Sequence, residues 1–201
     1  MPSEHGKFIV LYGINNLGKS TQAQALVKRL IAADKPAVYL KYPVYELEPT
    51  GPNINRVLRS EQKQQLTEID FQALYAQNRR DYQPTLEQTL AAGTTVVAED
   101  YTGTGIAWGL AKGAALEALE AQNADLRKED VTIWLDGQRF LDGREVTHLH
   151  ESNDALVERC RQTHAQLAQR YGWLRVDANQ PIAHVADAIW QILQQHWLNR
   201  K

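Results

Sequence analysis

The sequence predicts an α/β protein with a parallel five-stranded sheet and helices on both faces. Short apolar, β-rich runs alternate along the chain with longer stretches in which apolar residues recur at helical spacing. A loop containing two glycines joins the first run to the first helical stretch. Because strands that alternate with helices pair in parallel and are covered on both sides, this order indicates three layers, helix–sheet–helix.

The expected elements follow from the pattern, one after another. The strand-like runs cover 7–12, 37–41, 94–98, 131–135 and 173–176. The clearest helical stretches cover 18–33, 66–91, 152–171 and 182–197. The first run is apolar along nearly its whole length, which is typical of a strand buried on both faces. Asp34-Lys35-Pro36 and Ala92-Gly93 end two helices, and Pro181 stands where a first helical turn tolerates proline.

Bulk properties narrow the class of protein. A chain of 201 residues with ordinary composition is expected to form a single domain spanning 1–201. The net charge of −2 gives no general attraction to nucleic acid or membranes, and the single cysteine, Cys160, excludes an internal disulfide. No apolar run approaches the about 18 residues that cross a bilayer, and the amino terminus lacks the features of a signal peptide. We therefore expect a cytoplasmic protein.

The loop after the first strand carries the strongest functional signal. Gly13-Ile14-Asn15-Asn16-Leu17-Gly18-Lys19-Ser20 matches G-x-x-x-x-G-K-[ST], the pattern of loops that cradle nucleotide phosphates. The glycines let the backbone turn and approach a ligand closely, so that amide groups converge on phosphate oxygens. Lys19 is expected to reach the β- and γ-phosphates, and the Ser20 hydroxyl to hold Mg²⁺. The alternative is a glycine turn that merely starts a helix.

Polar residues follow several of the predicted strands. Lys41-Tyr42 comes after the second strand, Glu99-Asp100-Tyr101 after the third and Asp136 after the fourth. Ligands of parallel sheets bind beyond the carboxyl ends of the strands, so these residues should face the same crevice as the phosphate loop.

Five segments in this order resemble the thymidylate kinase family over nearly the full length, and with it the P-loop NTPase fold. The first is the run from Phe8 through Gly-Lys-Ser-Thr-Gln22. The others are Lys41-Tyr42-Pro43 (similar to Arg-Phe-Pro), Leu74-Tyr75-Ala-Gln-Asn78-Arg79 (similar to Leu-Phe-x-Ala-Asn-Arg), Glu99 to Trp108 (similar to the segment beginning Asp-Arg-Tyr) and Asp177-Ala-Asn-Gln180-Pro181 (similar to Asp-Ala-Ser-Gln-Pro).

The resemblance implies ATP and Mg²⁺ as cofactors and a role for each matching residue. The ATP phosphates would be held by Gly13, Asn15, Asn16, Leu17, Gly18, Lys19, Ser20 and Thr21, with Gln180 beside the adenine. Ser20 and Glu99 would lie at the metal ion. Tyr75 takes the place of the aromatic residue that stacks on the acceptor base, and Arg79 that of an arginine near this base and its phosphate. Lys41, Tyr42, Asp100, Tyr101 and Trp108 fall beside the acceptor. The family also implies a homodimer.

Several of these roles have structural alternatives. Tyr75 and Trp108 could belong to the core, Arg79 could be a solvated helix charge next to Arg80, and Glu99 could pair with a neighbouring cation.

The chain also departs from the family pattern. Asn15-Asn16 stands where the family has Asp-Gly, although Asn tolerates left-handed backbone better than most residues. Asp100 stands where the family has an arginine that grips the acceptor phosphate, and Tyr45 appears where it has another. A carboxylate repels a phosphate dianion. Lys41, Arg56, Arg59 and Arg79 are the cations that could compensate.

The lid is expected over about 137–150. In phosphoryl transfer, an arginine that contacts the transferring group can raise the rate by about 10³–10⁵. The only arginines in this stretch are Arg139 and Arg144. Surface charge is the alternative for both. His148 and His150 are expected to belong to a solvated loop, because no cysteine or third histidine lies close in sequence.

We therefore expect a kinase that transfers the γ-phosphoryl group of ATP to a nucleoside monophosphate, with dTMP as the expected acceptor. Lys19, Arg139, Arg144 and Glu99 are its expected catalytic residues. Two hypotheses remain open. The acceptor could be another molecule such as a deoxynucleoside, since Glu99-Asp100 suits a neutral hydroxyl. The missing arginines also suit a nucleotide-binding module that no longer performs the transfer.

Overall fold

The computed structural model describes residues 5–59, 65–140 and 154–198. Its strands are β1 (Phe8–Tyr12), β2 (Ala37–Lys41), β3 (Thr95–Glu99), β4 (Val131–Asp136) and β5 (Leu174–Asp177). Its helices are α1 (Lys19–Ala32), α2 (Thr50–Leu58), α3 (Glu68–Ala91), α4 (Thr102–Ala111), α5 (Leu116–Ala121), α6 (Asp154–Tyr171) and α7 (Ile182–Leu193), followed by the π-helical turn η3 (Gln194–Leu198).

The predicted strands and long helices are confirmed, and apart from the last helix their ends differ by no more than two residues. The last helix was expected over 182–197, whereas its α-helical part ends at Leu193 and continues as a π-helical turn. The three shorter helices α2, α4 and α5 were not expected. In α4 the reason is its composition, since the glycines of Thr102–Ala111 have poor intrinsic helix propensity and suggest a loop.

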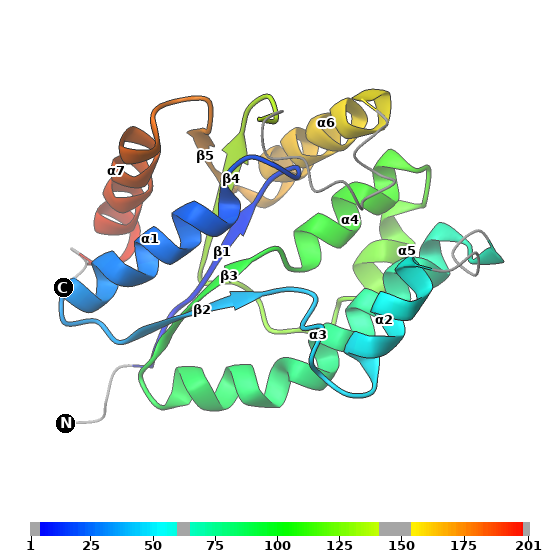
Figure 1. Cartoon of the computed structure of the whole chain (residues 1–201), viewed down its shortest axis with the longest axis horizontal. Coiled ribbons are helices and arrows are strands. Elements are labelled where there is room, and N and C mark those ends of the chain that lie inside the picture. The colour runs from blue at the N-terminus through cyan, green and yellow to red at the C-terminus, as the bar shows by residue number, and fades with distance from the viewer. Residues whose placement is uncertain (1–4, 60–64, 141–153, 199–201) are drawn as a thin grey trace.

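The five strands form one parallel sheet in the order β2-β3-β1-β4-β5. Figure 1 shows α1 and α7 on one side of this sheet and α3 and α4 on the other. Strand β1 is fully buried because helices cover both of its faces. Ile9 and Leu11 belong to the core cluster that contains the apolar faces of α1 and α7, while Phe8 and Val10 pack with Leu86 and Leu90 of α3 in a second cluster. The three-layer α/β prediction is therefore confirmed.

This strand order determines where functional residues can meet. Strand β1 lies between β3 and β4, with Leu11 opposite Glu99 and Tyr12 opposite Trp134. All strands run in the same direction, so the loop after β1, Asp100 after β3 and Asp136 at the end of β4 emerge at one edge of the sheet. These segments therefore lie at a common edge of the sheet, as parallel strands require.

Helix α4 approaches the sheet closely because it begins with small residues. The Gly103 amide donates a hydrogen bond to the Tyr12 hydroxyl over 3.1 Å, and Tyr12 stacks obliquely on Trp173 with ring centroids 4.4 Å apart. A Cβ on Gly103 would lie 2.6 Å from the Trp173 ring and 2.8 Å from that of Tyr12. The first turn of α4, which lies beside Asp100, is therefore positioned by a glycine that the two rings enclose.

Replacing Gly103 with Ala should lower the free energy of unfolding by about 1–3 kcal/mol, because the added methyl overlaps two rigid rings. Helix propensity favours alanine over glycine by about 1 kcal/mol and would by itself stabilise the variant. A decrease in the free energy of unfolding would therefore have to come from the steric overlap. Urea denaturation measures the change. Gly109→Ala is the matched control on the same helix, since its nearest neighbours are the rotatable Leu119 methyls, and it should cost less. Equal or reversed effects would contradict this packing.

Candidate active site

The loop between β1 and α1 has the backbone of a phosphate cradle. Gly13 has a φ of 146° and Gly18 a φ of 76°, values that side chains rarely allow. A Cβ on Gly13 would also lie 2.7 Å from the Leu135 carbonyl of β4, so glycine is required there for space as well. Asn16 has a φ of 60°, the left-handed conformation that asparagine tolerates. Asn16, which stands where the family has glycine, is therefore compatible with the loop.

Lys19 opens helix α1 and folds back over this loop. Its side chain is only 4% exposed. The ammonium donates hydrogen bonds to the Gly13 and Ile14 carbonyls over 3.0 and 2.9 Å and lies 3.7 Å from Asp100 Oδ1. A buried ammonium needs such compensation, because its desolvation is costly. The arrangement places one cation at the centre of the loop.

Glu99 at the end of β3 faces the first turn of α1. Its carboxylate accepts a hydrogen bond from the Tyr39 hydroxyl over 2.6 Å, and Lys41 Nζ lies 3.3 Å away. The Ser20 hydroxyl is close enough to lower the pKa of this carboxylate. Burial raises the pKa of Glu99, but the charge of Lys19, the Ser20 hydroxyl and the bond from Tyr39 together lower the pKa below its usual value. Glu99 is thus held ionised beside a hydroxyl oxygen.

The oxygens of Ser20 and Glu99 fit a Mg²⁺ ion in chemical type, since Mg²⁺ prefers oxygen ligands. Within residues 5–59, 65–140 and 154–198, no cluster of three or more His, Cys, Asp or Glu side chains could hold a metal alone. Sparse protein ligation of this kind is typical of Mg²⁺ that is shared with substrate phosphates.

Asp100 lies between the phosphate loop and helix α4. It has a φ of 61°, and its Oδ1 accepts a hydrogen bond of 2.7 Å from the Thr104 hydroxyl while facing Lys19. Burial raises the pKa of Asp100, and the charge of Lys19 opposes this effect. Consecutive carboxylates, Glu99 and Asp100, therefore point at the same ammonium from the end of β3.

Arg79 of α3 is a buried cation, so it is not the solvated helix charge considered as an alternative. It is 4% exposed and donates a hydrogen bond of 3.0 Å to Asn123. In the described part of the chain no carboxylate lies within ion-pair distance of its guanidinium, and its Nε has no hydrogen-bond partner. Burial lowers its pKa. Such a group is suited to an acceptor that enters beside it.

Neighbours of Arg79 on α3 and α4 form the second half of the candidate site. Tyr75 lies one helical turn before Arg79 and packs edge-on against Phe71, with ring centroids 5.2 Å apart. Gln72, one turn earlier, is 5% exposed. A Cβ on Gly105 would lie 2.9 Å from the amide oxygen of Gln72 and 3.0 Å from Arg79, so both side chains reach α4. Sequence reasoning missed Gln72, although its spacing from Tyr75 and Arg79 was visible.

The other residues that the family resemblance assigns to the acceptor differ in their surroundings. Tyr42 and Tyr101 lie in the core with ring centroids 5.0 Å apart, and neither buried hydroxyl has a hydrogen-bond partner among the described residues. Trp108 is partly buried against the main core cluster. Asn78, which sequence reasoning did not single out as a site residue, exchanges hydrogen bonds with the Val44 backbone and thereby fixes the loop after β2.

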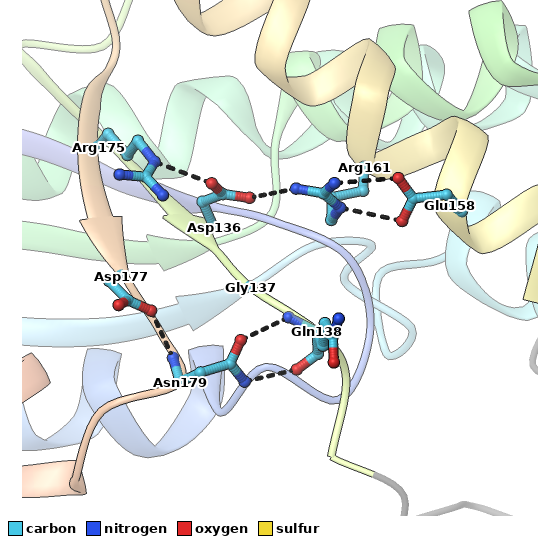
Figure 2. Close-up of a pocket in the computed structure, with 8 residues that line it drawn as sticks. All are labelled: Asp136, Gly137, Gln138, Glu158, Arg161, Arg175, Asp177 and Asn179. Atoms are coloured by element: carbon cyan, nitrogen blue, oxygen red, sulfur yellow. Dashed lines mark hydrogen bonds and ion pairs between the residues drawn. The ribbon is translucent and has the colours of Figure 1, made fainter.

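A charged pocket of about 290 Å³ lies at the ends of β4 and β5 (Figure 2). Asp136 accepts hydrogen bonds from Arg161 over 3.1 Å and from Arg175 over 2.8 Å. At the other side of the pocket, the Asn179 side chain bonds the Gln138 backbone twice. Both arginines escaped sequence reasoning, because neither belongs to a motif.

Of the remaining predicted residues, the structure describes Gln180 and Arg139. Gln180 comes directly after Asn179 in the sequence and donates a hydrogen bond of 2.9 Å to Asp177. Arg139 pairs with Asp154. The next residue, Phe140, donates its amide to the Asn16 carbonyl over 2.9 Å, which ties the start of the expected lid to the phosphate loop. Arg144, His148 and His150 lie outside the described residues.

Comparisons with known proteins agree with this geometry. The family model described as thymidylate kinase matches residues 11–189. Thymidylate kinase of Homo sapiens is 29% identical over 196 residues, covering 94% of this chain and 90% of that protein. Thymidylate kinase of Synechococcus sp. (strain CC9605) is 30% identical over 212 residues, covering 95% and 98%.

A solved structure shares the fold. The thymidylate kinase of Candida albicans superposes with a TM-score of 0.78 at 22% identity, over 95% of this chain and 92% of that one. The phosphate loop at the carboxyl edge of a parallel sheet, the match over most of the length and the shared fold lead to one conclusion. The chain belongs to the thymidylate kinase family, whose members are nucleoside monophosphate kinases.

Proposed function

We propose that this chain transfers the γ-phosphoryl group of ATP to dTMP and forms dTDP. The observation that carries the proposal is the buried ammonium of Lys19, held over a left-handed glycine loop beside the Ser20–Glu99 pair. Phosphoryl transfer asks little covalent chemistry of a protein, and positioned cations and amides supply most of the acceleration. Family membership supports dTMP as the acceptor.

On the donor side, the amides from Gly13 to Thr21 hold the phosphates and Lys19 exchanges its carbonyl and Asp100 contacts for the β- and γ-phosphate oxygens. Ser20 and Glu99 hold Mg²⁺, which when bound supplies positive charge that offsets the charge of the phosphates. We place the adenine beside the turn at Gln180, which follows Asn179 of the pocket in Figure 2.

On the acceptor side, Tyr75 stacks on the thymine and Arg79 binds its polar edge or phosphate. Trp108 and the buried rings of Tyr42 and Tyr101 form the wall behind them, and Lys41 provides a half-exposed cation at the mouth. Arg139 is the lid residue that we propose for the transferring group, since its neighbour Phe140 is hydrogen-bonded to the phosphate loop at Asn16. Arg144 is proposed as its partner.

Assembly and location belong to the same proposal. Within the described residues, no helix is both long and apolar enough to cross a bilayer. We propose a single-domain, cytoplasmic homodimer whose partners are small nucleotides and not nucleic acid, as the resemblance to the family suggests.

Purified protein with ATP, Mg²⁺ and dTMP should produce dTDP, and Lys19→Ala should lower kcat by about 10²–10³ because one preorganised cation is lost. A coupled ADP assay with chromatographic identification of dTDP measures both. Chelating Mg²⁺ with EDTA should abolish turnover. Absence of dTDP at micromolar enzyme, with a folded protein by circular dichroism, would contradict the proposal and favour a nucleotide-binding module.

Replacing Arg79 with Met should raise the KM for dTMP about tenfold or more, because the buried donor beside the base is lost. The free energy of unfolding should stay the same or rise by about 1 kcal/mol, since burying a cation without a carboxylate is costly. Arg80→Met is the matched control: Arg80 pairs with Asp125 at the surface and should not affect KM. An unchanged KM in Arg79→Met, or the same increase in both variants, would exclude this role.

A further inference from the structure

The pocket at the ends of β4 and β5 contains a guanidinium with two unused donors. Arg175 donates only through Nε, over 2.8 Å to Asp136 Oδ2, and its two terminal nitrogens have no partner among the described residues. Arg161 differs, because all three of its nitrogens bond Asp136 or Glu158. Asp136 thus anchors the Arg175 side chain and leaves the forked end of its guanidinium available to a ligand.

The register of the two strands places an acceptor group beside these donors. Arg175 and Asp177 are two residues apart on β5, so their side chains leave the same face of the strand. Figure 2 shows both along one side of the pocket. The oxygens of Asp177 each accept one hydrogen bond, from the Asn179 amide and the Gln180 side chain, and each can accept another. One wall of the pocket therefore offers paired donors next to a carboxylate.

The pocket lies where a nucleotide on the phosphate loop would place its base. The strand order puts β1 between β3, which leads to the proposed acceptor side, and β4, which leads into the pocket. A Cβ on Gly13 would lie 2.7 Å from the Leu135 carbonyl, and the next residue, Asp136, lines the pocket. Because the γ-phosphate has to face the acceptor, the nucleoside at the other end of the donor extends toward β4 and β5. The volume of about 290 Å³ suits a single base.

The free end of Arg175 matches guanine better than adenine. An arginine binds guanine through two parallel hydrogen bonds, to O6 and N7, whereas adenine carries an amino group in place of O6. With adenine, two donors would face each other. The N1 and N2 groups of guanine are donors, and Asp177 offers the acceptor that they need.

We propose that the donor site also accepts GTP, and that Arg175 recognises guanine by donating hydrogen bonds to O6 and N7. Asp177 accepts hydrogen bonds from the N1 and N2 groups of the base. The inference rests on the proposed function, because the triphosphate lies on the same loop and its γ-phosphoryl group passes to the same acceptor. ATP binds in the same pocket without the paired bonds from Arg175, so its binding depends little on this residue.

The test measures kcat and KM of the full chain for GTP and for ATP, each with Mg²⁺ and dTMP, with dTDP identified by chromatography. Wild type should form dTDP with either donor. Arg175→Met should raise the KM for GTP about tenfold or more and the KM for ATP by less than about twofold, because a bidentate arginine–guanine pair is lost. The kcat should stay the same with both donors, since Arg175 does not contact the transferring group.

Arg170→Met is the matched control. Arg170 also donates through Nε to one carboxylate, that of Glu120, and its side chain is 54% exposed compared with 62% for Arg175. It lies near the end of α6 and does not line the pocket, so this variant should match wild type with both donors.

A second measurement uses wild type and covers the case that Arg175→Met does not fold. 7-Deaza-GTP lacks the N7 acceptor and should have a KM about fivefold or more above that of GTP. 7-Deaza-ATP should differ little from ATP, because adenine does not form the bidentate pair. Equal KM values for GTP and 7-deaza-GTP would exclude the bond to N7.

The possible outcomes are distinct. Formation of dTDP from ATP but not from GTP would overturn this inference and leave the proposed function intact. If neither donor gives dTDP, the proposed function fails, and calorimetry with GTP and Mg²⁺ still tests the base contact: binding should weaken about tenfold or more in Arg175→Met, and unchanged binding would exclude it. An equal rise of KM for both donors in Arg175→Met would overturn the assignment of guanine recognition to Arg175.

Discussion

The burial of Lys19 is the constraint on which the site depends. An ammonium that is 4% exposed can persist only where carbonyl oxygens and a carboxylate replace water, and the Gly13 and Ile14 carbonyls and Asp100 do so. The carbonyls can converge because Gly13 and Gly18 adopt backbone angles that other residues resist. The site therefore depends on the central position of β1. Because β1 pairs with β3, the loop after β1 lies at the same edge of the sheet as Asp100, which follows β3.

The charged groups after β3 are paired with cations from two other segments. Lys19 and Lys41 face Glu99 and Asp100, whereas Arg79 stays buried without a carboxylate partner among the described residues. In the reaction that we propose, donor phosphates attract Lys19 away from Asp100, so that binding of the donor changes the charge around Asp100 through the movement of one lysine side chain.

The sequence allowed most of the framework to be predicted, because strand and helix periodicity and a glycine loop are local signals. It did not indicate α4, whose glycines suggest a loop until the rings of Tyr12 and Trp173 are seen around Gly103. It also left the burial of Arg79 open. Helical spacing places a residue on a face but does not say which helix covers that face. Arg161 and Arg175 become neighbours only when α6 and β5 flank Asp136.

The most direct test of the account is a crystal structure of the full chain with Mg²⁺ and a non-hydrolysable ATP analogue. If Lys19 is the phosphate-binding cation, the γ-phosphate accepts a hydrogen bond from Lys19 Nζ, the ammonium has moved away from Asp100, and the metal ion lies between Ser20 and Glu99. A triphosphate bound elsewhere, or a Lys19 still paired with Asp100 while the nucleotide is present, would contradict it.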